Sequence, residues 1–316
     1  MSIIIFPAAL ILALLAGLLI IALPNHFYRI TVDRKGPNPR ETNWLDTRIV
    51  EELWTESGDG LKLHALYVPA VGTTTGTAAQ TTTGTAANGT ADTAILVHGY
   101  SGDARQLASM ARVFHDQFGM NVLLPDARGH GQSEGHYIGF GWPERLDMLV
   151  WMDQVRQRNP GTGIILFGVS MGASTVLMTS GEQVPPELKL IIADCGYTSV
   201  VDELSWQMKL RYRFSFPPLI RVVSRMTKRR AGYTFEEASA LEQVKKSHVP
   251  TLFIHGEADT FVPFEMCGQL YRACAAPKEL YTVPGAEHGA AYSVDGEIYE
   301  QRLALFLEKY GFSKIS

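Results

Sequence analysis

The stretch Ile164–Gly172, which reads IILFGVSMG, decides the fold. Its first four residues are large and apolar, which predicts a buried β-strand, and the residues from Ala173 to about Thr179 continue as a helix. Between strand and helix lies the pattern G-x-S-x-G, with Ser170 at its centre. The two glycines permit a sharp turn and a close approach of the helix to the strand. The pattern therefore predicts a strand–turn–helix unit that presents the Ser170 hydroxyl at one edge of a sheet.

Five further short apolar runs alternate with helical stretches around this unit. Near-continuous apolar strands between helices are typical of a mostly parallel sheet that helices cover on both faces. Two antiparallel strands, joined by the turn signal at Ser57–Gly60, lead into that sheet. We therefore expect an eight-stranded α/β fold with the strands Val50–Thr55, Leu61–Val68, Ala94–Val97, Asn121–Pro125, Ile164–Phe167, Leu190–Ala193, Thr251–Ile254 and Leu280–Val283.

A serine hydroxyl needs a positioned base before it can act as a nucleophile at neutral pH. Among nine histidines, His288 follows the last predicted strand, at the sheet edge where we expect Ser170. His98 and His255 also end strands, but each is followed by glycine and starts a turn, so we interpret both as structural. His130 lies in a polar loop. The other histidines have no matching context: His26, His64, His115, His136 and His248. We therefore expect His288 to be the base.

The base in turn needs a carboxylate that fixes its tautomer. A predicted strand runs into the loop HGEAD at residues 255–259, and we choose Asp259 at the loop tip, with Glu257 as the alternative. The oxyanion of a tetrahedral intermediate also needs N–H donors. We expect one from the backbone of Met171, beside the nucleophile. The second should come from the backbone of Tyr100, in the tight turn HGYSG that follows the strand Ala94–Val97.

Taken together, these motifs resemble the α/β-hydrolase superfamily over roughly residues 45–312. The matching pieces are LVHGY (96–100), PDARGHGQS (125–133), GVSMG (168–172), HGEAD (255–259) and GAEHG (285–289). The chain order Ser170, Asp259, His288 is also that of the superfamily. Within it, the chain resembles the membrane-anchored Bem46-like hydrolases of bacteria, and the string DCGYTS at residues 194–199 supports this. The resemblance implies chemistry like that of carboxylesterases or dipeptidyl peptidases.

Two other groups invite a catalytic interpretation, and we favour a structural one for each. We interpret Asp126 and Arg128 as a buried ion pair that fastens neighbouring loops. Cys195 has no sequence neighbour that would activate its thiol, so we interpret it as a small buried residue. Three cysteines do not form a disulfide framework, and no Cys/His cluster has zinc-ligand spacing, so we expect neither a metal nor a cofactor.

Residues 2–23 carry no charge and consist mainly of Ile, Leu and Ala. As a helix they would span roughly 33 Å, which is enough to cross the hydrocarbon core of a bilayer. A cleaved signal peptide is the alternative, but its apolar region usually has only ~7–15 residues and ends at a small-x-small site, which is missing. We therefore expect a transmembrane anchor over residues 2–23 and a single-pass protein of the cell membrane.

The side of the membrane on which the domain lies stays open. Four basic residues that follow the anchor (Arg29, Arg34, Lys35 and Arg40) favour a cytoplasmic domain. The string TTTGTAA occurs at residues 73–79 and again at 81–87, and we expect a disordered low-complexity loop over 73–91. Thr-rich tracts of this kind, and the formal sequon at residues 88–90, point to the exterior. These two signals conflict.

The remaining sequence, residues 44–316, forms the predicted α/β-hydrolase domain. Residues 200–247 are inserted between two core strands and mix apolar with basic side chains, which predicts a small helical cap that packs on itself or covers an acyl group. A net charge of −4 gives no reason to expect nucleic-acid binding. We expect a serine hydrolase that cleaves small-molecule esters with short or medium acyl chains. The alternatives are a peptidase, an acyltransferase, or a catalytically idle protein that binds a ligand or a partner.

Overall fold

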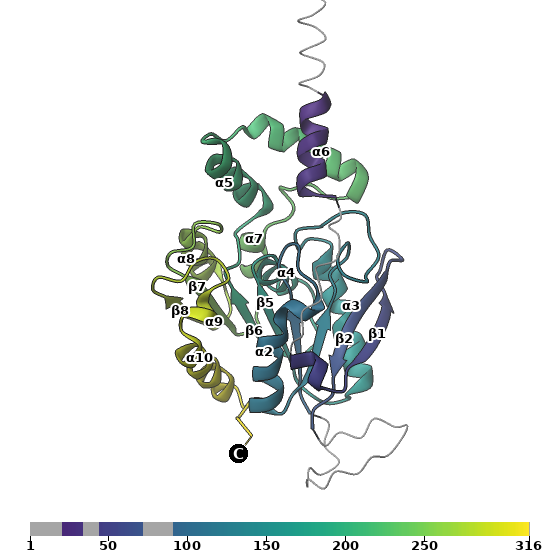
Figure 1. Ribbon diagram of the computed structural model, residues 1–316, viewed down its shortest axis with the longest axis vertical. Helices are drawn as coiled ribbons and strands as arrows, with labels where there is room; N and C mark the ends of the chain where they lie inside the picture. The colour runs from purple at the N-terminus through teal and green to yellow at the C-terminus, as the bar shows by residue number, and fades with distance from the viewer. Residues whose placement is uncertain (1–20, 34–43, 72–90, 316) are drawn as a thin grey trace, which may run out of the picture.

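The computed structural model describes residues 21–33, 44–71 and 91–315. Its centre is an eight-stranded sheet with the strand order β1-β2-β4-β3-β5-β6-β7-β8 (Figure 1). β2 pairs antiparallel with β1 and β4, and the remaining pairings in this sheet are parallel. The predicted mostly parallel, eight-stranded sheet is therefore confirmed. Its strands are β1 (Glu51–Glu56), β2 (Lys62–Val68), β3 (Thr93–Val97), β4 (Asn121–Pro125), β5 (Ile164–Val169), β6 (Leu188–Asp194), β7 (Thr251–Gly256) and β8 (Lys278–Val283).

The central strand β5 shows why the apolar runs form this sheet. Ile164 and Leu166 belong to one buried cluster, whereas Ile165 and Phe167 belong to another. Successive side chains of a strand point to opposite faces of the sheet, so a strand that is buried on both faces needs apolar residues at every position. The continuous run therefore specifies a strand with a hydrophobic core on each side.

Helices cover both faces of the sheet (Figure 1), as the sequence predicted. Side chains of α3, α4 and α8 contribute to one core cluster, and side chains of α2 and α10 contribute to the other. The helices and short helical turns are η1 (Trp44–Thr47), η2 (Ala104–Leu107), α2 (Ala108–Arg112), η3 (Val113–Gln117), α3 (Glu144–Arg158), α4 (Met171–Thr179), α5 (Val200–Tyr212), α6 (Pro217–Ala231), α7 (Ala240–Val244), α8 (Phe264–Ala273), α9 (Ala291–Val294) and α10 (Gly296–Lys309).

The predicted cap, residues 200–247, contains α5, α6 and α7, and its first two helices project beyond the sheet (Figure 1). α5 begins after Ser199, whose hydroxyl caps the helix, and ends at Arg213, whose φ of 63° is left-handed. Pro217 opens α6 with a φ that suits a first helical turn, and Gly232 ends it with a φ of 82°. The two helices are thus separated by local stop and start signals.

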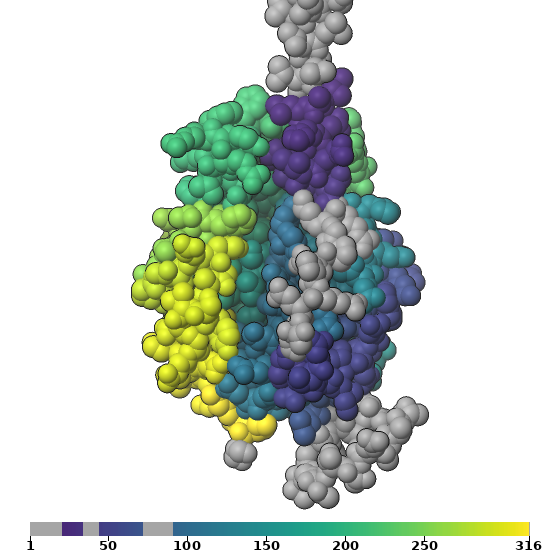
Figure 2. Space-filling model, viewed as in Figure 1, coloured from purple at the N-terminus to yellow at the C-terminus, as the bar shows by residue number. Residues whose placement is uncertain are grey.

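A further helix, over residues 21–31, lies beside the predicted cap (Figure 2). Phe27 and Tyr28 are buried in the main core cluster. The guanidinium of Arg230 on α6 lies over the Tyr28 ring, 4.5 Å from its centre. Further along, the Ile138 N–H donates to the carbonyl of Val32 at 2.6 Å. This segment is therefore packed into the fold by both apolar and polar contacts.

Two predicted segments fall outside the described residues. The predicted anchor lies at residues 2–23, of which only residues 21–23 are described, as the first residues of the helix over 21–31. Within the described ranges, no helix combines the length and the hydrophobicity that a membrane crossing requires. The predicted low-complexity loop at residues 73–91 lies outside them except for Ala91.

Candidate active site

Ser170 lies at the turn between β5 and α4, where the G-x-S-x-G pattern predicted it. Its backbone has φ 57° and ψ −117°, a combination that L-residues rarely adopt and that costs about 1–3 kcal/mol. The Ser170 N–H donates to the carbonyl of Asp194 on β6 at 2.8 Å, and the Ser170 carbonyl accepts from the N–H of Ser174 at 3.0 Å. These bonds hold the strained turn, which has the geometry of a nucleophile elbow.

The two glycines of the pattern are required because backbone atoms pass very close to them. A Cβ on Gly168 would lie 2.3 Å from the carbonyl oxygen of Gly172, and a Cβ on Gly172 would lie 2.0 Å from the carbonyl oxygen of Val97. Both distances are far shorter than a van der Waals contact. The glycines therefore let α4 start directly against β3 and β5, and this contact sets the position of Ser170.

His288 comes from the loop after β8 and contacts Ser170. Its Nε2 lies 2.8 Å from the Ser170 Oγ, and its Nδ1 lies 2.8 Å from Oδ2 of Asp259. The Phe261 ring lies against the imidazole, with ring centres 4.8 Å apart. The structure thus brings together the three residues that the sequence predicted as nucleophile, base and acid.

Asp259 lies in the loop after β7, and every hydrogen-bonding direction of its carboxylate is occupied. Oδ1 accepts from the N–H groups of Phe261 and Val262, each at 2.9 Å. Oδ2 contacts His288, and it also lies 3.2 Å from Nε2 of His255. Burial alone would raise the pKa of Asp259, but hydrogen bonds from the two histidines outweigh it and lower the pKa to about 2. Asp259 is therefore a permanent anion at neutral pH.

Glu257, the alternative acid, lies away from this cluster. Its carboxylate accepts from the Thr282 hydroxyl at 2.7 Å on an exposed part of β8. His255, which we interpreted as structural, has a closer relation to the site than the sequence suggested, because it contacts Asp259 directly. Its contact with that carboxylate raises the pKa of His255, although burial opposes the effect.

The two predicted oxyanion donors flank Ser170. Met171 is the first residue of α4, where backbone N–H groups have no partner within the helix. Tyr100 follows the turn at Gly99, where an added Cβ would lie 3.4 Å from the Ser170 Cβ. The Tyr100 side chain has a second role that the sequence did not reveal: its hydroxyl donates to the carbonyl of Thr31 at 2.8 Å. Tyr100 therefore joins the site to the helix over residues 21–31.

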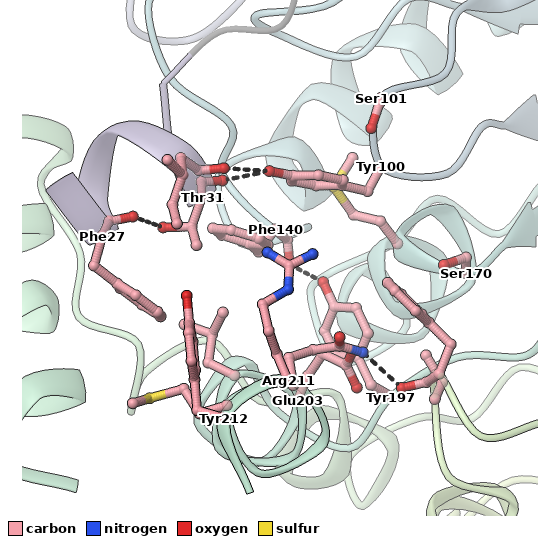
Figure 3. Close-up of a pocket in the computed structure, with 17 residues that line it drawn as sticks. Phe27, Thr31, Tyr100, Ser101, Phe140, Ser170, Tyr197, Glu203, Arg211 and Tyr212 are labelled. Atoms are coloured by element: carbon pink, nitrogen blue, oxygen red, sulfur yellow. Dashed lines mark hydrogen bonds between the residues drawn. The ribbon is translucent and has the colours of Figure 1, made fainter. Parts of the chain in front are cut away.

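Ser170 lines two cavities of about 460 Å³ each. The first is enclosed by the helix over residues 21–31, by Tyr100 and Phe140, and by side chains of α5, and most of its lining is apolar (Figure 3). The second contains His288 and the ring of Tyr292. A bound molecule can thus extend in two directions from the Ser170 hydroxyl, as the two halves of an acyl compound require.

The prediction of an ion pair between Asp126 and Arg128 is wrong, although both residues are buried. Arg128 binds the carboxylates of Asp147 and Asp59, at 2.6 and 2.8 Å. Asp126 instead lies 2.7 Å from Nδ1 of His64. A turn closed by the hydrogen bond from residue 130 to residue 127 begins between them and separates their side chains. Each residue still fastens neighbouring loops, so the structural interpretation stands with different partners.

Two buried carboxyl groups beside Ser170 were missed by the sequence analysis. Asp194, at the end of β6, lines the second cavity, and Glu203, on α5, lines the first. Burial raises the pKa of Asp194 to about 6 and the pKa of Glu203 to about 8. The position of Asp194 directly after the predicted strand Leu190–Ala193 is a signal that could have identified it. Glu203 has no such signal, because acidic residues are common in the first turn of a helix.

Cys195 is buried, as predicted, and burial raises the pKa of its thiol well above the ordinary value. Its sulfur lies with ligand atoms of Asp259 and His288 inside a group 4.8 Å across, which is the spacing of a metal site. However, His288 is already hydrogen-bonded to Asp259 through Nδ1 and to Ser170 through Nε2. The donor set therefore suits proton transfer better than metal binding.

Comparison with known proteins supports this architecture. A family model described as serine aminopeptidase, S33, matches residues 90–234. The uncharacterised protein YqkD of Bacillus subtilis is 30% identical over 218 residues, which cover 69% of this chain and 71% of YqkD. The matched family segment includes Ser170 and both residues predicted to form the oxyanion hole.

Solved structures share the fold at low identity. The Pyrococcus furiosus esterase Pf2001 superimposes with a TM-score of 0.65 at 21% identity, covering 87% of this chain and 99% of the esterase. The acylaminoacyl peptidase of Pyrococcus horikoshii gives a TM-score of 0.59 at 15% identity, covering 84% of this chain and 42% of the peptidase. Because the identity is low, these likenesses establish the fold alone. The chain therefore has the α/β-hydrolase fold, and its identity to YqkD shows that it belongs to the same family as that protein.

Proposed function

We propose that this protein is a serine hydrolase that cleaves carboxylic esters through an acyl-enzyme on Ser170. The observation that carries the proposal is the continuous hydrogen-bonded chain from the Ser170 hydroxyl through His288 to Asp259, with both links at 2.8 Å. Ser170, the first member of this hydrogen-bonded series, lies at a strained turn between two cavities, where a substrate can reach its hydroxyl. This combination of an activated nucleophile, an oriented base and an accessible cavity supports acyl transfer more directly than simple binding.

In the proposed mechanism, His288 Nε2 takes the Ser170 proton as Oγ attacks the ester carbonyl. The backbone N–H groups of Met171 and Tyr100 hold the resulting oxyanion, and Asp259 stabilises the imidazolium. His288 then gives its proton to the leaving alcohol, and the acyl group stays on Ser170. A water molecule, deprotonated by His288, attacks this acyl-enzyme and releases the carboxylic acid and the free serine.

The first cavity supports a substrate with a short or medium acyl chain. Its volume of about 460 Å³ is within the range of small-molecule sites, and its lining is largely apolar. The esterase Pf2001 shares the fold, which is consistent with ester chemistry. A peptidase is the second candidate, favoured by the description of the matching family and by the fold shared with the acylaminoacyl peptidase.

We also propose that the protein is a single-pass membrane protein, resembling the Bem46-like hydrolases, with its anchor at residues 2–23. The apolar N-terminal sequence is the main support. In addition, Phe214 and Phe216 in the link between α5 and α6 are 60% and 46% accessible, and this link lies at the same end of the molecule as the helix over residues 21–31 (Figure 1). Extraction of membranes at alkaline pH tests this proposal, because an integral protein stays in the pellet and a soluble one is released.

A fluorophosphonate probe tests whether Ser170 is an active nucleophile. We expect labelling of the wild-type protein and none of Ser170→Ala. The matched control is Ser109→Ala, which removes an exposed hydroxyl at the second cavity and should label normally. Absence of labelling in the wild type, or equal labelling of Ser170→Ala, would contradict the proposal and favour a catalytically idle protein.

A substrate panel separates the reaction classes. p-Nitrophenyl esters of increasing chain length should turn over, whereas aminoacyl amides should react much more slowly. Turnover of amides alone would replace the esterase proposal with the peptidase. Faster release of the leaving group when alcohols are added, with formation of new esters, would favour an acyltransferase.

A further inference from the structure

Glu203 is a buried carboxyl group in the wall of the first cavity. Its residue is 8% accessible, and the side chain lies among the cavity-lining residues of α5 together with Leu204 and Met208. Oε1 accepts a hydrogen bond from Nε2 of Gln207 at 2.8 Å. Oε2 has no hydrogen-bond partner among the residues that the structure describes. A buried oxygen without a partner, in a side chain that lines a cavity, is a site at which a bound molecule can complete the hydrogen bonding.

The neighbouring amide cannot satisfy Oε2. Gln207 Nε2 has two hydrogens, and it donates one to Glu203 Oε1 and one to the carbonyl of Phe261 at 2.8 Å. A second hydrogen bond also holds α5 to the loop after β7, because Trp206 Nε1 donates to the carbonyl of Thr260 at 2.8 Å. Glu203 is therefore fixed in place by a rigid contact between α5 and the loop that carries Asp259.

The protonation state of Glu203 decides what it can bind. Burial raises its pKa to about 8, although the bond from Gln207 opposes the effect, so the group is mainly a neutral acid at pH 7. Because Oε1 accepts from an N–H group, the acid proton lies on Oε2. The cavity therefore contains an O–H donor that lacks an acceptor within the described part of the chain.

The charge of the cavity favours an uncharged ligand group over a cation. Arg211, one of the labelled residues around the cavity in Figure 3, also lines it and would repel an ammonium group. Among the ion pairs of the described residues, none includes Glu203. A carbonyl, hydroxyl or ether oxygen accepts a hydrogen bond from the neutral acid without bringing a charge into an apolar space.

We propose that Glu203 is a specificity-determining residue that donates a hydrogen bond to an uncharged oxygen of the substrate, so that the preferred esters carry a hydroxy, keto or alkoxy group on the chain in the first cavity. This inference rests on the proposed function, because it assumes that this cavity receives an ester that reacts at Ser170. It adds a substrate class: oxygen-substituted chains in place of plain hydrocarbon chains.

Matched pairs of esters test the inference. Each pair has the same chain length and differs by one hydroxy, keto or ether oxygen, placed on the acyl side in one series and on the alcohol side in another. We expect the wild type to prefer an oxygenated member by roughly tenfold in kcat/KM. Glu203→Gln keeps a neutral donor of similar shape and should keep the preference within about threefold. Glu203→Leu should lower kcat/KM for the oxygenated member about tenfold more than for its plain partner, which removes the preference.

The matched control is Glu308→Leu, which makes the same change at an exposed position of α10 and should alter neither class of ester. Two results would overturn the inference: no preference in the wild type for any oxygenated ester, or equal loss of plain and oxygenated turnover in Glu203→Leu. A preference for aminoacyl esters that Glu203→Gln abolishes would also overturn it, because that result requires a carboxylate and a cationic substrate.

Binding measurements separate failure of this inference from failure of the proposed function. The affinity of each ester is measured by isothermal titration with Ser170→Ala and with the double variant Ser170→Ala/Glu203→Leu. Both proteins lack the nucleophile, so the measurement reports binding without hydrolysis. If Ser170→Ala binds the oxygenated member more tightly and the double variant does not, the role of Glu203 is supported. This holds even if the wild type hydrolyses no ester. Equal binding of both members to Ser170→Ala contradicts it even if the wild type is an active esterase.

Discussion

Asp259 and Glu203 are both buried carboxyl groups near Ser170, 5% and 8% accessible, but their pKa values shift in opposite directions. Burial raises both pKa values. At Asp259 the hydrogen bonds and charges of two histidines outweigh burial, and the pKa falls to about 2. At Glu203 a single amide donor does not, and the pKa rises to about 8. The supply of hydrogen-bond donors, rather than burial, decides which of the two is charged.

The difference extends to the regions that carry these residues. We call the segments after β5, β7 and β8 that carry Ser170, Asp259 and His288 the triad loops. Their three functional side chains are hydrogen-bonded to one another, and Gly168, Gly172 and Gly256, which have no room for a side chain, set the path at the ends of β5 and β7. The predicted cap, in contrast, leaves Glu203 Oε2 without a partner in the described structure and exposes apolar side chains. The triad side chains are therefore paired with one another, whereas the cap carries a carboxyl oxygen without a partner among the described residues.

Loss of the base tests the triad loops most directly. In His288→Ala the Ser170 hydroxyl loses its proton acceptor at 2.8 Å, so we expect kcat for p-nitrophenyl esters to fall by roughly 10⁴–10⁶-fold. The apolar cavity does not change, so KM should change little. A fall of less than tenfold would show that His288 is not the base. Circular dichroism and thermal unfolding of the variant serve as the control for folding.

The Asp259→Asn substitution tests whether the charge of this carboxyl matters as well as its shape. The amide oxygen can still accept from Phe261 and Val262, but the amide N–H₂ then faces His288 and favours the wrong tautomer of the base. We expect kcat to fall by roughly 10³–10⁴-fold, less than in His288→Ala. The rate of fluorophosphonate labelling measures the attack of the Ser170 hydroxyl alone, without the later steps of turnover. Equal rates for Asp259→Asn and the wild type would show that the anion is not needed.

The sequence predicted the triad loops well because their signals are local. Each strand is a short apolar run, and Ser170, Asp259 and His288 each lie in a short motif that directly follows such a run. Topology then brings the ends of parallel strands to one edge of the sheet. These three residues could therefore be placed together without knowledge of any side-chain contact.

The partners of buried polar groups could not be predicted in this way. Arg128 binds Asp59, which is 69 residues away in the chain, and not its near neighbour Asp126. His255 contacts Asp259, and Glu203 is buried by packing of α5 against a loop that is 54 residues from Gln207. Such contacts depend on how helices and loops pack in three dimensions, so periodicity and motifs carry no information about them.

The stability of Glu203→Gln as a function of pH tests whether the Glu203 carboxyl is neutral in the folded protein. A carboxyl whose pKa is raised on folding ionises first in the unfolded chain, so wild-type stability falls as pH rises from the ordinary pKa of 4.5 through about 8. Glutamine does not ionise and avoids this loss. We expect the variant to match the wild type near pH 4 and to be more stable by roughly 3–5 kcal/mol at pH 8.

Thermal unfolding of the full chain in detergent at several pH values measures this effect. A difference in Tm that grows with pH between 4.5 and 8 supports the neutral, poorly solvated carboxyl. A constant difference across that range contradicts it. The acid side provides an internal reference: the lowered pKa of Asp259 stabilises the fold above its ordinary pKa of 3.8, and this contribution is lost in both proteins as pH falls towards 2.

Tyr100→Phe has the smallest expected effect. It tests the side chain of Tyr100, which joins the active site to residues 21–33, separately from its backbone N–H. The Tyr100 hydroxyl donates to the Thr31 carbonyl, while the backbone N–H is the predicted oxyanion donor. Its ring stacks on Phe140 with centres 5.8 Å apart, and phenylalanine keeps this contact. Loss of one hydrogen bond should weaken docking of residues 21–33 by about 1 kcal/mol, seen as faster hydrogen exchange there, with kcat within threefold.

Because burial raises the pKa of the Tyr100 hydroxyl to about 12, we expect it to take no part in proton transfer. A fall in kcat of more than tenfold, with Tyr310→Phe unaffected, would instead show that the side chain acts in the reaction.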